Sequence, residues 1–140
     1  MDYNLITNVI FPQHTNSVEE LWEIAKCGET EDGLYIIIFT NDGGWIPHFH
    51  IYNNQNPKKA TFDACLKIET PEYFKHVNHT DILNRKQMKS IYDFLQGVDD
   101  DGDSNWKYII KTWNKNNSKQ TIPIDLLIPD YMSLIGQREH

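Results

Sequence analysis

The chain has 140 residues, of which 39% are hydrophobic and 12% aromatic, so it is long and apolar enough to form one domain with an ordinary core. Its formal net charge of −7 opposes non-specific binding to nucleic acid, and two cysteines are too few for a disulfide framework. The longest apolar run, residues 34–39, cannot cross a bilayer, and the first residues lack the features of a secretory signal. These features predict a cytoplasmic protein that binds neither nucleic acid nor membrane.

The N-terminal part of the chain predicts a short strand followed by a helix. Residues 2–11 alternate loosely between polar and apolar side chains, as a strand does. Ser17 followed three residues later by Glu20 is a capping box, the usual signal for the start of a helix. We expect this helix to end at Gly28. Its apolar face would consist of Val18, Leu21, Trp22 and Ala25.

Three apolar segments then predict a sheet. Residues 34–40 form a β-branched run, and the turn-forming residues 41–44 separate it from a second segment at 45–53. The third segment, 60–68, alternates between apolar and polar side chains. Because the connections are short, we expect an antiparallel β-meander of three or more strands.

The remaining chain predicts two helices. Apolar residues recur at helical spacing over 82–96, where Gly97 ends the pattern, and again over 105–115. Residues 121–128 are apolar and contain proline, which fits either a strand or a packed extended tail. Helices covering one face of the sheet would make residues 1–140 a single α+β domain. We expect a core of Trp22, Phe49, Phe62, Leu66, Ile91, Leu95, Trp106, Ile109 and Trp113.

The segment Ile46-Pro47-His48-Phe49-His50-Ile51-Tyr52 carries the most distinctive chemistry. Side chains two residues apart on a strand share a face, so His48 and His50 should stand side by side. A hairpin closing over residues 41–44 would place Ile37 opposite His48 and Tyr35 opposite His50. Phe49 and Ile51 would then face the helices.

The third strand could bring further reactive groups to the histidines. If Phe62, Ala64 and Leu66 are buried with Phe49 and Ile51, then Asp63 and Cys65 lie on the histidine face. The candidate catalytic residues are therefore His48, His50, Asp63 and Cys65, with Tyr35 and Tyr52 as neighbours. His48 and His50 are also candidate ligands for zinc or another divalent transition metal, which His76 and His79 could join. Acid–base or nucleophilic chemistry, metal binding and two ordinary structural histidines all fit this pattern.

Two other patterns suggest sites less strongly. The acidic segment 99–105 does not match a calcium-binding EF-hand loop, because Gly102 and Ile110 fall at the wrong positions. It is typical of a solvated loop in which Ser104 or Asn105 caps the next helix. Lysines recur every four residues at Lys107, Lys111 and Lys115, and Arg85, Lys86 and Lys89 add charge to the preceding helix. The lysines indicate either a solvated face or a docking surface for an acidic partner or a phosphate chain.

The histidine segment is similar to two known patterns. His48-Phe49-His50-Ile51-Tyr52 resembles part of the histidine-triad nucleotide hydrolase motif, but Tyr52 stands where that motif has its third histidine. Pro47-His48-Phe49-His50 with the later Asn105-Trp106 resembles a group of small bacterial proteins of unknown function, often encoded in toxin–antitoxin-like neighbourhoods. This second resemblance covers roughly residues 34–115, although the Glu-Tyr-Gly usual in that group is replaced here by Tyr52-Asn53-Asn54.

The resemblance implies a bacterial or phage-type interaction or toxin–antitoxin-like module with a paired-histidine site, which binds a protein partner or self-associates. The alternative is a small hydrolase in which His48 and His50 perform acid–base or metal-assisted chemistry. No residue pattern indicates an organic cofactor.

Overall fold

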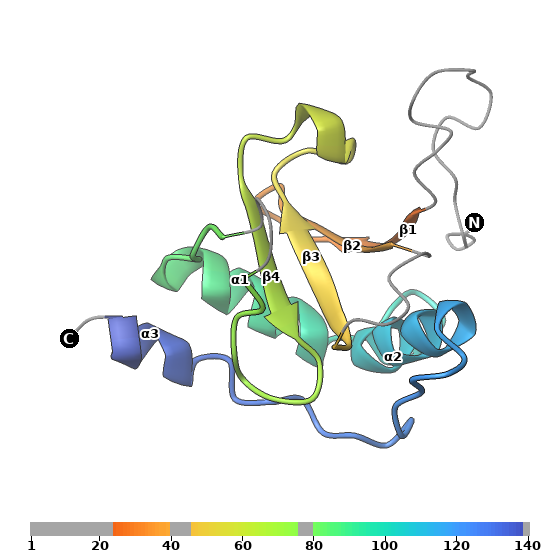
Figure 1. The fold of residues 1–140 in the computed structure, drawn as a ribbon. Coiled ribbons are helices and arrows are strands. Elements are labelled where there is room, and N and C mark those ends of the chain that lie inside the picture. Colours follow the sequence, from red (N-terminus) through yellow and green to blue (C-terminus); the bar gives the residue numbers. More distant parts are fainter. Residues whose placement is uncertain (1–23, 40–45, 76–79, 139–140) are drawn as a thin grey trace.

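The structure, a computed structural model, describes residues 24–39, 46–75 and 80–138 (Figure 1). Its four-stranded antiparallel sheet has the order β1-β2-β3-β4, and helices α1 and α2 lie against one face of it. The predicted α+β fold with a β-meander is therefore confirmed, with one strand more than the three that were placed. No helix among the described residues is long and apolar enough to span a bilayer. The elements are β1 (Ile24–Glu29), β2 (Tyr35–Phe39), β3 (His48–Tyr52), a 3-10 turn (Pro57–Lys59), β4 (Asp63–Lys67), α1 (Arg85–Gln96), α2 (Asn105–Asn116) and α3 (Ser133–Arg138).

The additional strand, β1, replaces the C-terminal part of the predicted first helix. Residues 24–29 pair with β2 over its whole length, so the prediction of a helix ending at Gly28 is wrong. The physical reason is that β2 is buried on both faces and its backbone needs hydrogen bonds along both edges. The predicted strand at 2–11, the capping box and Trp22 lie outside the described residues.

Gly28 lies where a larger side chain would collide with a neighbouring ring. The β1–β2 register shifts between Lys26 and Gly28, which makes Cys27 the extra residue of a β-bulge. A Cβ atom placed on Gly28 would lie 2.0 Å from Cζ of Phe94, on helix α1. The glycine thus allows the ring of Phe94 to lie directly on the backbone of the sheet.

The main core lies between the sheet and the helices. Trp106 and Trp113 of α2 are 3% and 0% exposed, and Phe62 is partly buried against the same cluster. The predicted core residues that the structure describes are therefore confirmed as core or as packed on it. Residues fully buried here from the sheet and the two helices include Ile36, Ile38, Phe49, Ile51, Ala64, Leu66, Met88, Ile91, Leu95, Ile109 and Ile110.

Both main helices begin at side-chain caps. The Asn84 carboxamide accepts a hydrogen bond from the Gln87 amide in a complete capping box, so α1 starts three residues later than the sequence pattern suggested. Ser104, one of the two predicted caps, accepts from the amide of Lys107 at the start of α2. The α1 helix ends before Gly97, as predicted.

Of the two structures predicted for residues 121–128, the packed extended tail is the one observed. Its backbone forms hydrogen bonds with side chains of α2. The indole nitrogens of Trp106 and Trp113 donate to the carbonyl oxygens of Leu126 and Gln120, at 2.8 and 2.9 Å. Asn114 exchanges two hydrogen bonds with the backbone of Ile122. The sequence pattern did not predict the short helix α3 that follows, which adds Leu134 and Ile135 to the core.

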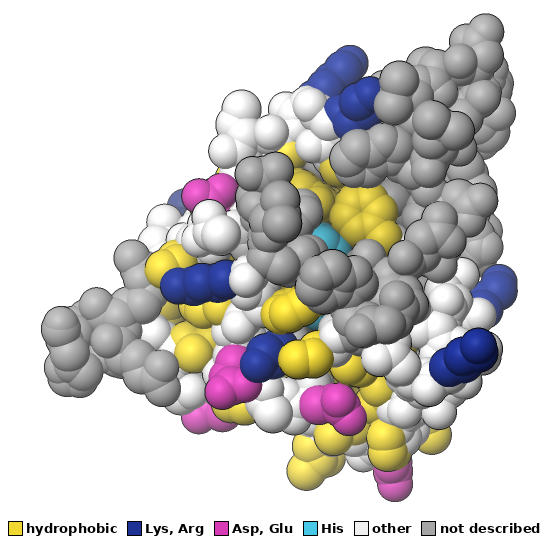
Figure 2. Space-filling view, in the orientation of Figure 1, with side chains coloured by type: hydrophobic (Ala, Val, Ile, Leu, Met, Phe, Trp, Pro, Cys, Tyr) yellow, Lys and Arg dark blue, Asp and Glu magenta, His cyan; other side chains and the backbone are white. Residues whose placement is uncertain are grey.

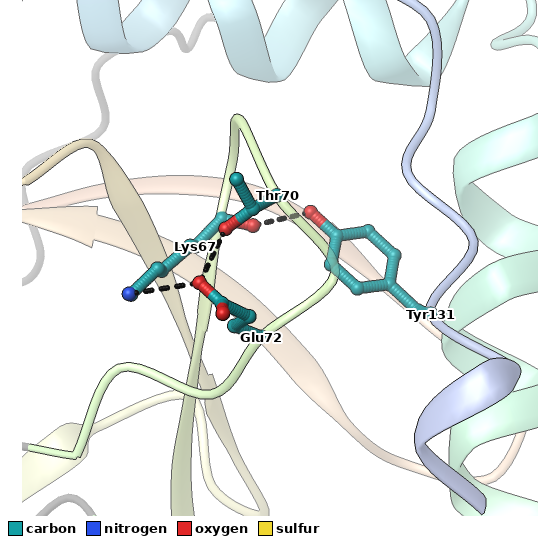
Figure 3. Close-up of polar contacts among 4 residues, drawn as sticks. All are labelled: Lys67, Thr70, Glu72 and Tyr131. Atoms are coloured by element: carbon teal, nitrogen blue, oxygen red, sulfur yellow. Dashed lines mark hydrogen bonds and ion pairs between the residues drawn. The ribbon is translucent and has the colours of Figure 1, made fainter.

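Tyr131, just before α3, fastens this tail to the sheet. Its hydroxyl donates to the carbonyl oxygen of Lys67 at the end of β4 (Figure 3). In the same view, Glu72 accepts from the side chains of Lys67 and Thr70, at 3.0 and 2.9 Å. Burial raises the pKa of Tyr131 well above its usual value, since the phenolate would lose its hydration.

A second polar link joins the β1–β2 turn to α1. The carboxylate of Asp32 accepts hydrogen bonds from Thr30 and Ser90, both at 2.6 Å. Partial desolvation acts to raise the pKa of Asp32, but these two bonds, with Lys86 nearby, lower it overall below 3.8. Because the folded-state pKa is lowered, the ionised carboxylate stabilises the fold at neutral pH.

We predict that Gly28→Ala destabilises the protein by about 1–3 kcal/mol, because the new methyl group must displace the Phe94 ring. Combining it with Phe94→Leu should cost less than the sum of the two single changes. Urea denaturation of the four proteins in this double-mutant cycle measures the coupling. Gly97→Ala is the control, since its Cβ would meet nothing closer than 3.4 Å. Additive effects of Gly28→Ala and Phe94→Leu would contradict the close contact.

We predict that Asp32→Asn lowers the stability at pH 7 by roughly 0.5–1 kcal/mol, after allowance for solvent screening of this exposed group. The difference from wild type should be complete above pH 3.8 and should shrink as the pH falls through the lower folded-state pKa. Thermal unfolding between pH 7 and pH 2 measures it. Asp93→Asn, which removes only the exposed pair with Lys89, should show a smaller effect. Equal pH profiles for wild type and Asp32→Asn would disprove this role.

Candidate functional site

The pairing of β2, β3 and β4 brings the reactive side chains to the second face of the sheet. His50 pairs with Cys65, and Phe49 pairs with Leu66, so Cys65 lies on the histidine face as predicted. Ile37 pairs with His50, however, so its predicted pairing with His48 is wrong. The centre of the β2–β3 hairpin lies one residue further along the chain than a turn over 41–44 would place it. The resulting shift of two residues leaves every side chain on its predicted face.

Tyr35 follows the same correction, since it pairs with Tyr52 in place of His50. Tyr52 is a direct neighbour of the site because its ring stacks on His50, with centroids 5.8 Å apart and planes 6° apart. Tyr35 packs at the margin of a small second cluster centred on Ile37 and Tyr52.

This second face is buried, although the sequence analysis predicted a helical cover for the other face only. His48 is 0%, His50 1% and Cys65 1% exposed. Figure 2 shows only small areas of histidine, recessed among hydrophobic side chains. All five residues of β3 are therefore buried, and the sheet has a core on each side.

Aromatic rings surround the two imidazoles. The ring of Phe39 stands edge-on to His50 at 4.7 Å, and those of Phe74 and Trp113 lie 4.9 and 5.5 Å from His48. The two imidazoles themselves are 4.8 Å apart, with their planes at 71°. The site is thus a polar centre within an apolar shell.

Three atoms that could bind a metal, two imidazole nitrogens and one sulfur, converge in this centre. One ring nitrogen of His48, one of His50 and the Sγ atom of Cys65 all lie within 4.8 Å of one another. We call these three residues the triad. Imidazole and thiolate are the donors that zinc, copper and related metals prefer.

A backbone contact fixes the tautomer of His48. Nδ1 of His48 lies 2.6 Å from the carbonyl oxygen of Ile46, and a carbonyl only accepts, so Nδ1 carries the proton. In the neutral ring, the lone pair therefore belongs to Nε2, which is fully buried. In metal-binding histidines, the N–H group of the second ring nitrogen typically donates a hydrogen bond to a carbonyl in this way.

The segment after β4 closes the site from the edge of the sheet. Tyr73 forms a bridge with Leu66, and the amide of Phe74 donates to the carbonyl oxygen of Cys65 at 2.9 Å. Because residues 73–74 run antiparallel beside β4, Phe74 lies on the same face as Cys65 and reaches His48. No pattern in the sequence of residues 70–75 indicated this isolated bridge to β4.

Asp63 does not join the triad. It pairs with Tyr52, two residues before Cys65, and its amide donates to the carboxylate of Asp81. Its carboxylate is not among the clustered ligand atoms. His76 and His79 lie outside the described residues, so their predicted approach to the site stays a prediction.

The other cysteine, Cys27, lies in the main core on the opposite face of the sheet. Burial raises the pKa of its thiol to about 12, an effect that a hydrogen bond with Thr112 only partly offsets. Cys27 is therefore an inert thiol at neutral pH and serves as a natural control for Cys65.

The acidic loop has an ordinary structural explanation, whereas the lysine face fits both of its predicted roles. Asp99 accepts hydrogen bonds from the amides of Asp101 and Asp103, which closes the turn between α1 and α2. These three carboxylates are exposed and near one another, as acidic groups often are without an ion. Lys107, Lys111 and Lys115 are all exposed, which fits either a solvated face or the predicted docking surface.

Comparisons with models of protein families, with curated proteins and with solved structures gave no match. The site must therefore be interpreted from its own geometry and chemistry.

Proposed function

We propose that this protein is a small metal-binding domain whose triad holds a transition-metal ion between β3 and β4. The observation that carries the proposal is the convergence of two imidazole nitrogens and one thiol sulfur within 4.8 Å, in a fully buried position. Imidazole nitrogen and thiolate sulfur are preferred donors for such ions, and one ion could coordinate all three residues at once.

The distances suit a site that contracts slightly around an ion. Tetrahedral ligands at bond lengths of about 2.0–2.3 Å lie roughly 3.3–3.8 Å from one another. The present limit of 4.8 Å therefore requires shifts of about 1 Å, which small side-chain rotations supply. The β3–β4 pairing and the Nδ1 contact of His48 keep the three donor atoms close to the positions that coordination requires.

Burial supports a structural ion in preference to a catalytic one. A hydrolase needs an imidazole or an open metal position that a substrate can reach. Here His48 and His50 are 0% and 1% exposed, and Phe74 and Trp113 pack on His48. We therefore propose that the ion stabilises the buried face of the sheet that carries the triad. The hydrolase is the less favoured alternative. The predicted protein partner is compatible with this structural role.

Metal analysis of the purified protein tests the proposal, and the two cysteines provide matched variants. Wild type and Cys27→Ser should each bind about one equivalent of metal and should lose thermal stability when a chelator removes it. Cys65→Ser should lose this effect. With cobalt(II) as the probe, the near-ultraviolet thiolate-to-cobalt band should appear in wild type and Cys27→Ser only.

Far-ultraviolet circular dichroism of each variant guards against an unfolded protein. If Cys65→Ser does not fold, the chelator and cobalt results on wild type and Cys27→Ser decide alone. The proposal fails if folded wild type takes up no stoichiometric transition metal. It also fails if a folded Cys65→Ser binds cobalt with the same spectrum as wild type.

A further inference from the structure

An ion can reach the triad only after a covering element moves, because all three triad residues are 1% exposed or less. The rings of Phe39, Phe74 and Trp113 pack on the two imidazoles. They belong to β2, to residues 69–75 and to α2, respectively. We call residues 69–75 the strap. The cover that moves with the least loss of buried contacts is the best route for an ion.

The strap is the outermost of these covers. None of its residues is buried, and Phe74, its ring over the triad, is itself partly exposed. Trp113, in contrast, is 0% exposed and belongs to the main core. Phe39 lies within the sheet, where it pairs with Ile24 of β1. Movement of α2 or β2 would break the core or the sheet, whereas the strap can move with less loss of buried apolar contact.

Backbone hydrogen bonds and an exposed ion pair fasten the strap to β4. The amides of Lys67 and Phe74 donate to the carbonyl oxygens of Glu72 and Cys65, both at 2.9 Å. The carboxylate of Glu72 accepts from the side chains of Lys67 and Thr70, and we call these two contacts the latch (Figure 3). They lower the pKa of Glu72, the bond from Lys67 foremost, so this carboxylate is charged at neutral pH. Because the side chain of Glu72 is 58% exposed, the latch is weak enough to open and close readily.

We propose, on the basis of the metal site proposed above, that the strap is the gate through which the metal ion enters and leaves the triad. When the latch and the backbone bonds to β4 open, the ring of Phe74 leaves His48 and the Sγ atom of Cys65 becomes accessible. The ion then binds as the Cys65 thiol releases its proton to solvent. Closure of the strap returns the ring of Phe74 to His48 and restores the apolar shell around the ion.

Stopped-flow kinetics of cobalt(II) test the gate, with the thiolate-to-cobalt band as the signal and excess chelator to start release. Glu72→Gln weakens the latch, so uptake and release should both become about two- to fivefold faster, with an unchanged dissociation constant. Glu69→Gln is the matched control, because it removes the same charge from the same segment and leaves the latch intact. If the carboxylate of Glu72 merely attracted the cation, its loss would slow uptake, which is the opposite result.

Amide hydrogen exchange measures the opening of the strap in the metal-free protein. The amides of Lys67 and Phe74 bond between β4 and the strap, so they should exchange about two- to fivefold faster in Glu72→Gln than in wild type. The amide of Met88, which donates to the carbonyl oxygen of Asn84 at the start of α1, should exchange at the same rate in both proteins.

The outcomes separate the gate from the metal site. Equal cobalt kinetics in Glu72→Gln and Glu69→Gln would overturn the gate while the metal site stands, even if amide exchange showed that the strap opens. Faster uptake without equally faster release would also overturn the gate, because a gate changes both rates alike. If wild type takes up no cobalt, the proposed function fails and the gate fails with it.

Discussion

Burial of β3 on both faces is the constraint on which the rest of the structure depends. A strand that alternates sides sends Phe49 and Ile51 to the helices and His48, His50 and Tyr52 to the opposite side, and all five are buried. Each neighbouring element satisfies a part of this requirement. β2 and β4 bond both edges of the strand, the tryptophans of α2 pack on its first two residues, His48 and Phe49, and residues 73–74 close the histidine side.

The sequence predicted which side chains share a face, because strand periodicity depends only on counting by two. His48, His50 and Cys65 were therefore grouped correctly even though the β2–β3 pairing was displaced by two residues. Apolar spacing likewise predicted α1 and α2, and the predicted cap at Ser104 marks the start of α2. These signals lie within a few residues of one another, and they survive in the folded chain because the tertiary contacts agree with them.

The errors arose where distant contacts overrode local patterns. Helical spacing up to Ala25 predicted a helix, but the open edge of β2 required a strand there. Gly28 resembled a helix terminus, and only the position of Phe94, 66 residues later in the chain, explains it. The burial of the histidine face was also missed, since an alternating polar strand is usually solvated and the covering rings of Phe39, Phe74 and Trp113 come from separate elements.

The pairing of residues 73–74 with β4 has a consequence for the behaviour of the molecule in crowded solution. The outer edge of a sheet presents unsatisfied amides and carbonyls on which strands of other molecules can add, the first step towards fibrils. Here the backbone amides of Lys67 and Phe74 donate to the carbonyl oxygens of Glu72 and Cys65. The chain therefore covers the outer edge of β4 at these residues. The same short segment that covers the imidazoles therefore also discourages aggregation through β4.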